Sequence, residues 1–435
     1  MTMEKAGAPG ASAGLLGRLS LMMFLQYAIW GAWLPILFPF LLGHRHFSLD
    51  EVGAILSAGA AGAILGPFIA GQIADRHFAT EKFLAISHLA GAILVWSLAD
   101  CSSFWHFLVR SAIYGLIYAP TLALTNSLAF HHLPDRDRDF GKVRLWGTIG
   151  WIAAGIGIGQ WLLAHHTPAG VTAEVAAAAQ DASRADAFRL SAILGAIMGL
   201  FCLSLPHTPP SRDAGKRNAS LEALQEIRKP RLLVLFLLAV PVSCIHQFYF
   251  VHTADFLSDY GHDAAAKINR IFGVGGGGLM TIGQMSEILV LAAIPFMAKK
   301  LSRKGFLALG LAAYAARMAL FAYCERPPFV LLGVALHGLC FGCFIFVAFM
   351  VVDEETSADV RASAQNLFNL VIVGIGIIVG SFLATSVVGN WAKEGAGDDR
   401  SLYFQRLFSV PMWAALFCLA ALLVAYPGRR REGAA

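Results

Sequence analysis

Twelve long apolar stretches run along this chain and constrain its fold more than any other feature. A helix that crosses a bilayer needs about 20 mostly apolar residues. Stretches of that kind lie near residues 18–43, 50–74, 82–101, 105–130, 143–164, 187–206, 231–256, 278–298, 304–324, 328–352, 363–388 and 404–426. Only 14% of all residues are charged, against about 25% in soluble domains. Because an open sheet edge cannot survive in lipid, the sequence predicts an all-α membrane protein with twelve transmembrane helices.

One polar stretch, HTPPSRDAGKRNASLEALQEIRKP, divides these helices into two sets of six. We therefore predict an N-terminal six-helix half over residues 1–206, a central cytoplasmic loop over 207–230 and a C-terminal six-helix half over 231–435. This plan is typical of an alternating-access transporter, which binds its substrate near the midplane between the halves. No GxxxxGK[ST] motif occurs, so nothing indicates ATP as the driver.

Lysine and arginine are concentrated in alternate loops, for example at Arg136, Lys142, Arg228, Lys299 and Arg303. The positive-inside rule then predicts that both termini are cytoplasmic. The net charge of +5 reflects this topology, and we expect no nucleic-acid partner. The first apolar stretch is too long for a cleaved signal peptide, so we expect it to remain as the first span.

Polar and aromatic side chains interrupt five of the stretches at helical spacing, where residues three or four apart share a face. They are Gln26, Trp30 and Trp33; Arg144, Thr148 and Trp151; His246, Gln247 and Phe250; Gln284 and Glu287; and His337, Phe341 and Phe344. Because an ionisable group at membrane depth is costly, we expect these faces to line a cavity. Its amides, aromatic rings, single cation and single carboxylate suit a nucleoside or an oligosaccharide equally.

Most of these residues also have a structural interpretation. Trp30 is typical of an interfacial aromatic belt, and Arg144 begins its predicted span and so suits a cytoplasmic anchor. Gln247 could bond a neighbouring helix, and His337 could be a satisfied core histidine. Arg317, inside YAARMALF, is expected to be structural, either snorkelling or pairing.

Glu287 is the hardest of these residues to explain structurally. It lies in the apolar segment GQMSEILVLAAIPFM, without a cation nearby in sequence. Burial away from water disfavours the charged form of a carboxylate, so Glu287 is suited to take up a proton on one side and release it on the other. We predict that it carries the coupled proton.

The remaining motifs point to no enzyme. Cys340 and Cys343 form a CxxC one helical turn after His337, but buried cysteine in a span is more often a small apolar residue. We find no nucleophile–base–orienter set and no metal cluster. We therefore predict no cofactor, no metal and no catalytic activity.

Six segments, taken in order, carry a family likeness: FLQYAIWGAWLP, YAPTLALTNSLAF, VRLWGTIGWI, GQMSEILVLAAIPFM, RMALFAYCERP and VRASAQNLFNL. Together they resemble the bacterial nucleoside:proton symporters, a family of the major facilitator superfamily. The loop GQIADRHFATEK also resembles the superfamily's signature, with Asp75 and Arg76 matching its cytoplasmic latch. The resemblance implies the major facilitator fold and proton-coupled nucleoside transport across a bacterial inner membrane.

The resemblance also implies a binding site. The family's span-five arginine, threonine and aromatic positions fall on Arg144, Thr148 and Trp151, where a nucleoside permease has phenylalanine at the last. Its glutamine of span seven falls on Gln247, and its glutamine and glutamate of span eight fall on Gln284 and Glu287. Its span-ten aromatic position falls on Phe341.

Three positions depart from the family pattern. An asparagine is replaced by Phe250, a tyrosine by His337, and an acidic residue by Gly342. These departures lie in the implied substrate cavity, and His337 would add an imidazole able to titrate near neutral pH. They keep open another nucleoside range or a different polar substrate.

Two other functions remain open at this point. One is a carrier of the same fold for a sugar or a drug, including an exporter, which nucleoside competition would distinguish. The other is a membrane sensor that transports nothing, which a counterflow assay would distinguish.

Overall fold

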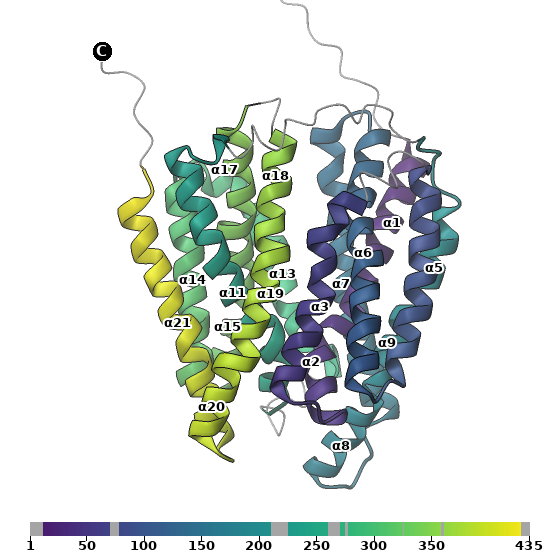
Figure 1. Ribbon diagram of the computed structural model, residues 1–435, viewed down its shortest axis with the longest axis vertical. Coiled ribbons are helices and arrows are strands. Elements are labelled where there is room, and N and C mark those ends of the chain that lie inside the picture. The colour runs from purple at the N-terminus through teal and green to yellow at the C-terminus, as the bar shows by residue number, and fades with distance from the viewer. Residues whose placement is uncertain are drawn as a thin grey trace, which may run out of the picture.

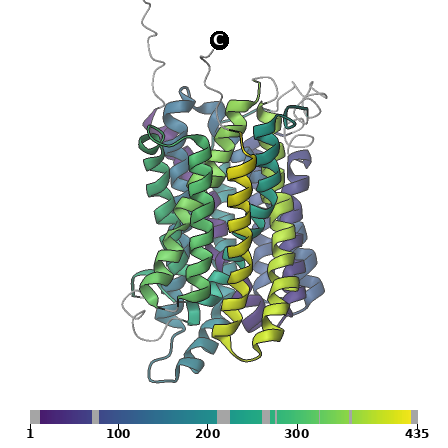
Figure 2. The ribbon, with the colours of Figure 1, turned by 90° about the vertical axis from the view of Figure 1, so that its left-hand side faces the viewer.

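Apolar segments of 20 to 33 residues form the long helices of this protein. The computed structural model describes residues 12–69, 78–209, 225–259, 270–274, 277–324, 326–357 and 361–427. Within these residues, 11 helices are long and apolar enough to cross a membrane. The long helices run roughly along one axis (Figures 1 and 2), as expected when every backbone polar group must be bonded within its own helix.

The first group of helices, here called the N-terminal group, begins with α1 and ends with α9. It consists of α1 (Ala13–Trp33), η1 (Leu34–Ile36), α2 (Leu37–Pro39), π-helical η2 (Phe40–His44), α3 (Leu49–Ile69), α5 (Thr80–Ala99), α6 (Phe104–His132), α7 (Arg136–His165), α8 (Ala173–Ser183) and α9 (Ala185–Cys202). Helix α1 packs against α7, α3 against α6 and α5 against α9. A Cβ at Gly150 would lie 2.1 Å from the Phe24 carbonyl oxygen, so glycine allows α7 and α1 to touch at the backbone.

The second group, here called the C-terminal group, begins with α11 and ends with α21. It consists of α11 (Pro230–Asp259), α13 (Gly277–Met297), α14 (Arg303–Tyr323), α15 (Pro327–Ala335), α16 (His337–Leu339), η4 (Cys340–Phe346), α17 (Val347–Glu355), α18 (Arg361–Asn369), η5 (Leu370–Ile375), α19 (Gly376–Phe382), η6 (Leu383–Val387), α20 (Val388–Ala396) and α21 (Arg400–Ala425). The segments η4, η5 and η6 are π-helical, a rare geometry that is frequent at functional sites.

The two groups lie side by side (Figure 1). Helix α1 begins and α21 ends at one end of the bundle, here called the terminal face; α8 and α20 lie at the opposite end, here called the far face. Helix α3 packs against α19, and α7 against α13.

Contacts between the groups are concentrated toward the far face. Gln160 Nε2 donates to the Arg270 carbonyl oxygen at 2.7 Å, and the Val274 amide donates to Gly159 at 3.0 Å. Asn390 Nδ2 donates to Asp50 Oδ1 at 3.2 Å. Across the described residues, the hydrogen bonds and ring contacts joining the groups lie at mid-depth or toward this face.

A contact between two glycines also joins the groups toward the far face. Gly273 has φ +80°, and a Cβ there would lie 2.0 Å from the Gly159 carbonyl carbon. Glycine alone adopts such a backbone conformation without steric cost. The two groups therefore touch at the backbone here.

The helices agree with the sequence predictions to within several residues, with three differences. Helix α20 ends at Ala396, about two turns after the predicted residue 388. Helix α7 begins at Arg136, about two turns before the predicted residue 143, and a Lys142–Asp139 ion pair of 2.9 Å supports its polar start. Helix α8 was not predicted; it is rich in alanine, the strongest helix former, and Thr172 caps it. The predicted latch residues Asp75 and Arg76 lie outside the described residues.

Candidate functional site

Helix α13 carries Gln284 and Glu287 about one turn apart, on a shared face. Glycines bring this helix close to its neighbours in the C-terminal group. A Cβ at Gly338 would lie 2.4 Å from the Ser286 carbonyl carbon, and a Cβ at Gly283 would lie 2.9 Å from His337 Cβ. As a result, His337 Nε2 lies 3.8 Å from Glu287 Oε2, with the two side chains 2% and 12% exposed.

Arg317 lies on the other side of His337. Its Nη1 is 3.2 Å from His337 Nδ1, and its guanidinium carbon lies 4.2 Å from the Tyr249 ring centre. Arg317 was expected either to snorkel or to pair. Snorkelling was wrong, because the side chain is 0% exposed, and the contact with His337 matches pairing. The sequence signal was an arginine in the middle of an apolar span, one turn after Tyr314.

A second imidazole adjoins this cluster. His246 on α11 lies with its ring centre 5.3 Å from that of His337, and its Nδ1 is 2.7 Å from the Tyr314 hydroxyl. Sequence analysis placed His246 on a polar stripe but gave no role to Tyr249 or Tyr314. Neither tyrosine interrupts the apolar pattern, so their part in the cluster depends on the packing of α11 against α14.

Arg144 faces this cluster from the N-terminal group. Its guanidinium carbon lies 4.0 Å from the Tyr27 ring centre, and it is close enough to Glu287 for attraction between the two charges. Because α7 begins two turns before Arg144, this residue does not begin its helix. Arg144 therefore lies inside α7, where its guanidinium packs on Tyr27.

Aromatic rings connect the two groups beside the charged residues. The ring centres of Trp151 and Phe250 lie 6.4 Å apart at 74°, and those of Phe250 and His337 lie 5.9 Å apart at 89°. Phe341 stacks on His337 at 6.4 Å and 20°. Thr148, one turn before Trp151, is half-buried like these three aromatic side chains.

The two glutamines of the C-terminal group differ in their hydrogen bonds. Gln247 is 7% exposed and its Nε2 donates to Ser381 Oγ at 3.0 Å, which matches a role in holding α11 to α19. Gln284 is 5% exposed, and its buried Oε1 has no hydrogen-bond partner among the described residues. A buried acceptor without a partner costs free energy, so a bound molecule that donates to it would stabilise this site.

Gln26 and Trp30 lie in a separate network of the N-terminal group. Gln26 Nε2 donates to Thr121 Oγ1 at 2.8 Å, and Gln26 Oε1 lies 3.0 Å from His88 Nε2. The Tyr118 hydroxyl donates to the main-chain carbonyl oxygen of Gln26, and the ring centres of Trp30 and Tyr118 lie 4.9 Å apart in a stacked arrangement. Both ends of the Gln26 amide are thus occupied within the protein.

Gly342 has no room for the side chain that the family pattern places there. A Cβ at this position would lie 2.7 Å from Val290 Cγ1. The position therefore accepts an acidic residue only if Val290 moves.

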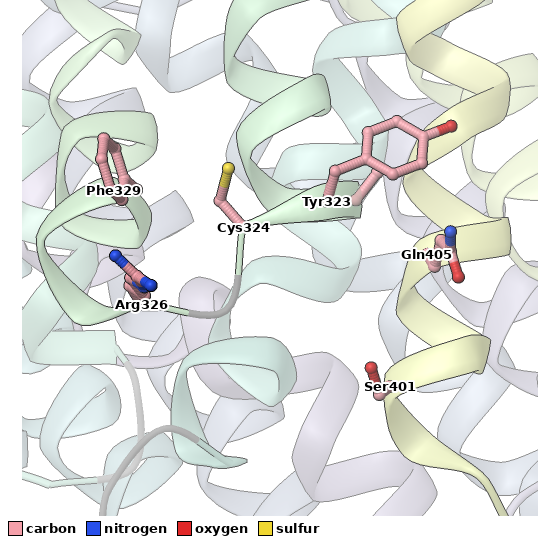
Figure 3. A pocket seen from close by; sticks show the side chains of 7 residues that line it. Tyr323, Cys324, Arg326, Phe329, Ser401 and Gln405 are labelled. Carbon is pink, nitrogen blue, oxygen red and sulfur yellow. The ribbon is translucent and has the colours of Figure 1, made fainter.

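A cavity of about 580 Å³ lies away from these residues (Figure 3). It lies where α14 ends, α15 begins and α21 begins, and it is lined by Ala322, Tyr323, Cys324, Arg326, Phe329, Ser401 and Gln405. None of the residues predicted to bind substrate lines it.

The profile of the family described as "Nucleoside H+ symporter" matches residues 14–430. The chain belongs to this family. It is 34% identical over 376 residues to the putative nucleoside transporter YegT of Escherichia coli (strain K12), covering 83% of this chain and 82% of that protein. It is 27% identical over 401 residues to the nucleoside permease NupG of the same organism, covering 89% and 91%.

The fold is similar to that of a solved relative. The crystal structure of the nucleoside transporter NupG matches with a TM-score of 0.79 at 25% identity, covering 95% of this chain and all of that one (100%). The predicted family is confirmed, and so is an all-helical, multi-pass membrane fold of the major facilitator type.

Proposed function

We propose that this chain is a proton-coupled nucleoside transporter that works by alternating access. One observation carries the proposal. In a member of the nucleoside symporter family, Gln284 keeps a buried, unpartnered acceptor one turn from Glu287, and Arg144 of the other helix group attracts that carboxylate. The first feature leaves an atom free for a ligand, and the second is an attraction between charges on the two groups.

The surrounding side chains suit a nucleoside. Trp151, Phe250 and Phe341 offer ring faces and edges to a base, and Gln284 accepts from an N–H or hydroxyl donor. The full proposed set of substrate-binding residues is Gln26, Trp30, Arg144, Thr148, Trp151, Gln247, Phe250, Gln284, Glu287, His337 and Phe341. Within it, we assign direct contact to the residues around Gln284 and a supporting role to Gln26 and Gln247, whose amides bond protein groups.

Proton coupling follows from the position of Glu287 between the groups. The charged carboxylate is attracted to Arg144 across the α7–α13 contact, and a proton on Glu287 removes that attraction. Alternating access must break and remake contacts between the groups. Proton and substrate are coupled because both change the stability of the same states.

We also propose the full topology. Helix α3 brings the number of spans from 11 to twelve. Its 21 residues extend about 31 Å at 1.5 Å per residue, and the apolar core is about 30 Å thick. The two groups then correspond to six-helix halves over residues 1–206 and 231–435, joined by the loop 207–230.

The positive-inside rule makes the terminal face cytoplasmic. Basic residues gather there: Lys229, Arg231, Lys299, Arg303 and Lys304. The far-face contacts then close the outer side of the inner membrane.

Uptake of labelled nucleosides into proteoliposomes tests the function. We expect accumulation above equilibrium when the outside is more acidic, and only equilibration when a protonophore removes the gradient. Protein-free liposomes control for leakage. Absence of uptake for a panel of purine and pyrimidine nucleosides would contradict the proposal.

Phe250, His337 and Gly342 favour a second candidate, a carrier for another polar solute such as a sugar or a drug, including an exporter. These residues remove an amide, a phenol and a carboxylate from the family's cavity. In the same assay, unlabelled sugars would then compete with the substrate where nucleosides do not.

A further inference from the structure

Arg317 is a buried cation whose surroundings need an explanation. Its side chain is 0% exposed, and two tyrosine rings lie against it, with centres 4.2 Å (Tyr249) and 5.0 Å (Tyr314) from its guanidinium carbon. In the described part of the chain its hydrogen bond goes to His337 Nδ1, at 3.2 Å, and its Nε and Nη2 have no partner. A charged group held so deeply in a span generally marks a functional role.

The contact between Arg317 and His337 determines where the imidazole holds its proton. A guanidinium has N–H donors and no acceptor, so His337 Nδ1 must be the acceptor and carry no hydrogen. The neutral ring then has its proton on Nε2. That nitrogen lies 3.8 Å from Glu287 Oε2, so the N–H is on the side of the ring that faces the carboxylate, beyond direct hydrogen-bond distance.

We infer that Arg317 is a positioning residue that holds His337 as a neutral Nε2–H donor directed at Glu287 and at a ligand beside it. Only the role of Glu287 in this statement rests on the proposed function. The imidazole links a fixed positive charge to a carboxylate that changes its charge. Arg317 approaches this carboxylate through His337 from within the C-terminal group, whereas Arg144 attracts it from the other group.

The groups that face His337 support this assignment. Arg317 and Tyr314 come from α14, His246 and Tyr249 from α11, and Glu287 from α13; Cys340 follows on η4. Among these, Glu287 is the one carboxylate, and Arg317 occupies the nitrogen that a second proton would need. The expectation that His337 titrates near neutral pH therefore does not fit this geometry.

The same arrangement explains how histidine replaces the tyrosine of the family pattern. A tyrosine supplies an O–H donor on an aromatic ring, and a neutral imidazole supplies an N–H donor on the Glu287 side only when its proton is on Nε2. Arg317 selects that tautomer. The pair Arg317–His337 thus keeps a ring-borne donor at the site, displaced from the phenol position.

Nitrogen-15 NMR of protein labelled at histidine tests the tautomer directly, because protonated and bare ring nitrogens have distinct signals. The His337 signals are those that disappear in His337→Phe. We expect a bare Nδ1 and a protonated Nε2 throughout the range from about pH 5 to 8. A protonated Nδ1, or a ring that becomes doubly protonated in this range, would overturn the inference.

Arg317→Met removes the donor and should raise the fraction of rings protonated at Nδ1. An unchanged tautomer fraction in this variant would also overturn the inference. If Arg317→Met does not fold, the wild-type spectrum alone decides, because it needs no variant at position 317. The spectrum needs no nucleoside either, so it can support the tautomer even if the nucleoside assay fails.

A matched pair of variants tests the donor in transport. His337→Tyr and His337→Phe differ by one hydroxyl group, and each keeps an aromatic ring against Tyr249 and Phe341. We expect the tyrosine variant to retain proton-driven accumulation and the phenylalanine variant to lose substrate affinity by about five- to 150-fold. Equal transport by the two would show that no donor is needed at this position.

Discussion

Two buried glutamines, Gln26 in the N-terminal group and Gln284 in the C-terminal group, have the same chemistry and opposite surroundings. Gln26 is 0% exposed, and its amide bonds Thr121 at one end and His88 at the other. Gln284 is also buried, but its carbonyl oxygen has no partner in the described part of the chain. Gln26 completes a hydrogen-bond network within the protein, whereas Gln284 leaves an acceptor for a bound molecule.

The two glutamines also differ in the charge of their neighbours. The network around Gln26 joins α1, α5 and α6 through neutral groups. The charged groups near Gln284 are Glu287 on the same helix, Arg317 on α14, which reaches Glu287 through His337, and Arg144 across the group interface. Fixed neutral networks specify one packing, whereas charges that one proton can change allow two. The comparison assigns stability to the first region and coupling to the second.

The largest effect is expected from Glu287→Gln, which keeps the shape of the side chain and removes its ability to titrate. Proton-driven accumulation of nucleoside should be lost, because no proton can be carried. Exchange of labelled for unlabelled nucleoside in the absence of a gradient should persist, because it needs no net proton movement. Both are measured in proteoliposomes.

The control for this variant is Glu81→Gln, which changes a carboxylate of α5 that bonds His207 and the Thr208 amide and lies outside the site. Accumulation should persist in it. If Glu287→Gln accumulates nucleoside as the wild type does, the carboxylate is not the proton carrier.

The next effect separates the two glutamines. Gln284→Ala should weaken nucleoside affinity by about five- to 150-fold, since one hydrogen bond in a buried site accounts for about 1–3 kcal/mol. Its thermal stability should change little, because the lost oxygen had no partner in the protein. Gln26→Ala should do the reverse, lowering stability by about 1–3 kcal/mol, because Thr121 and His88 lose their partner.

Binding is measured by titration of the detergent-solubilised protein, and stability by its thermal unfolding. Gln247→Ala gives a third reference, since this glutamine bonds Ser381 and should behave like Gln26. Equal loss of affinity in all three variants would contradict the division between support and ligand contact.

Much of this division could not be read from sequence. The apolar stretches predicted the helices because lipid leaves the backbone no alternative, and helical spacing placed Gln284 and Glu287 on one face. Spacing within a helix does not say which helix that face meets. Gln26 and Gln284 therefore looked alike, and both snorkelling and pairing stayed open for Arg317. What distinguishes them is the approach of α13 to α16 through Gly283 and Gly338, a contact between segments about 55 residues apart.

The family likeness supplied what spacing could not, because a relative's site residues already reflect its packing. It identified Arg144, Gln284 and Glu287 together. It gave no role to Arg317, since that role depends on the histidine by which this chain departs from the pattern. The structure adds most where the sequence is least like its relatives.

The smallest effect is expected in substrate selectivity. Phe250 and His337 replace an amide and a phenol of the family pattern. The ring of Phe250 lies beside Trp151, and that of His337 beside Phe341. A site that bonds a ligand's hydroxyl or amine rejects analogues that lack it, whereas an apolar wall discriminates weakly. The double variant Phe250→Asn with His337→Tyr should therefore narrow the range of nucleosides that compete for uptake.

The measurement is a competition profile with a panel of nucleosides for the wild type and the double variant, each at two pH values. Since Arg317 holds His337 neutral, the wild-type profile should be the same at both pH values, and the change should come from the polar groups gained. Restoring the acidic residue at Gly342 would not serve as well, because Val290 occupies the space that its Cβ needs. Identical profiles for wild type and double variant would mean that the rings of Phe250 and His337 do not contact the substrate. Substrate contact would then be confined to Gln284, Glu287, Phe341 and the residues of α7.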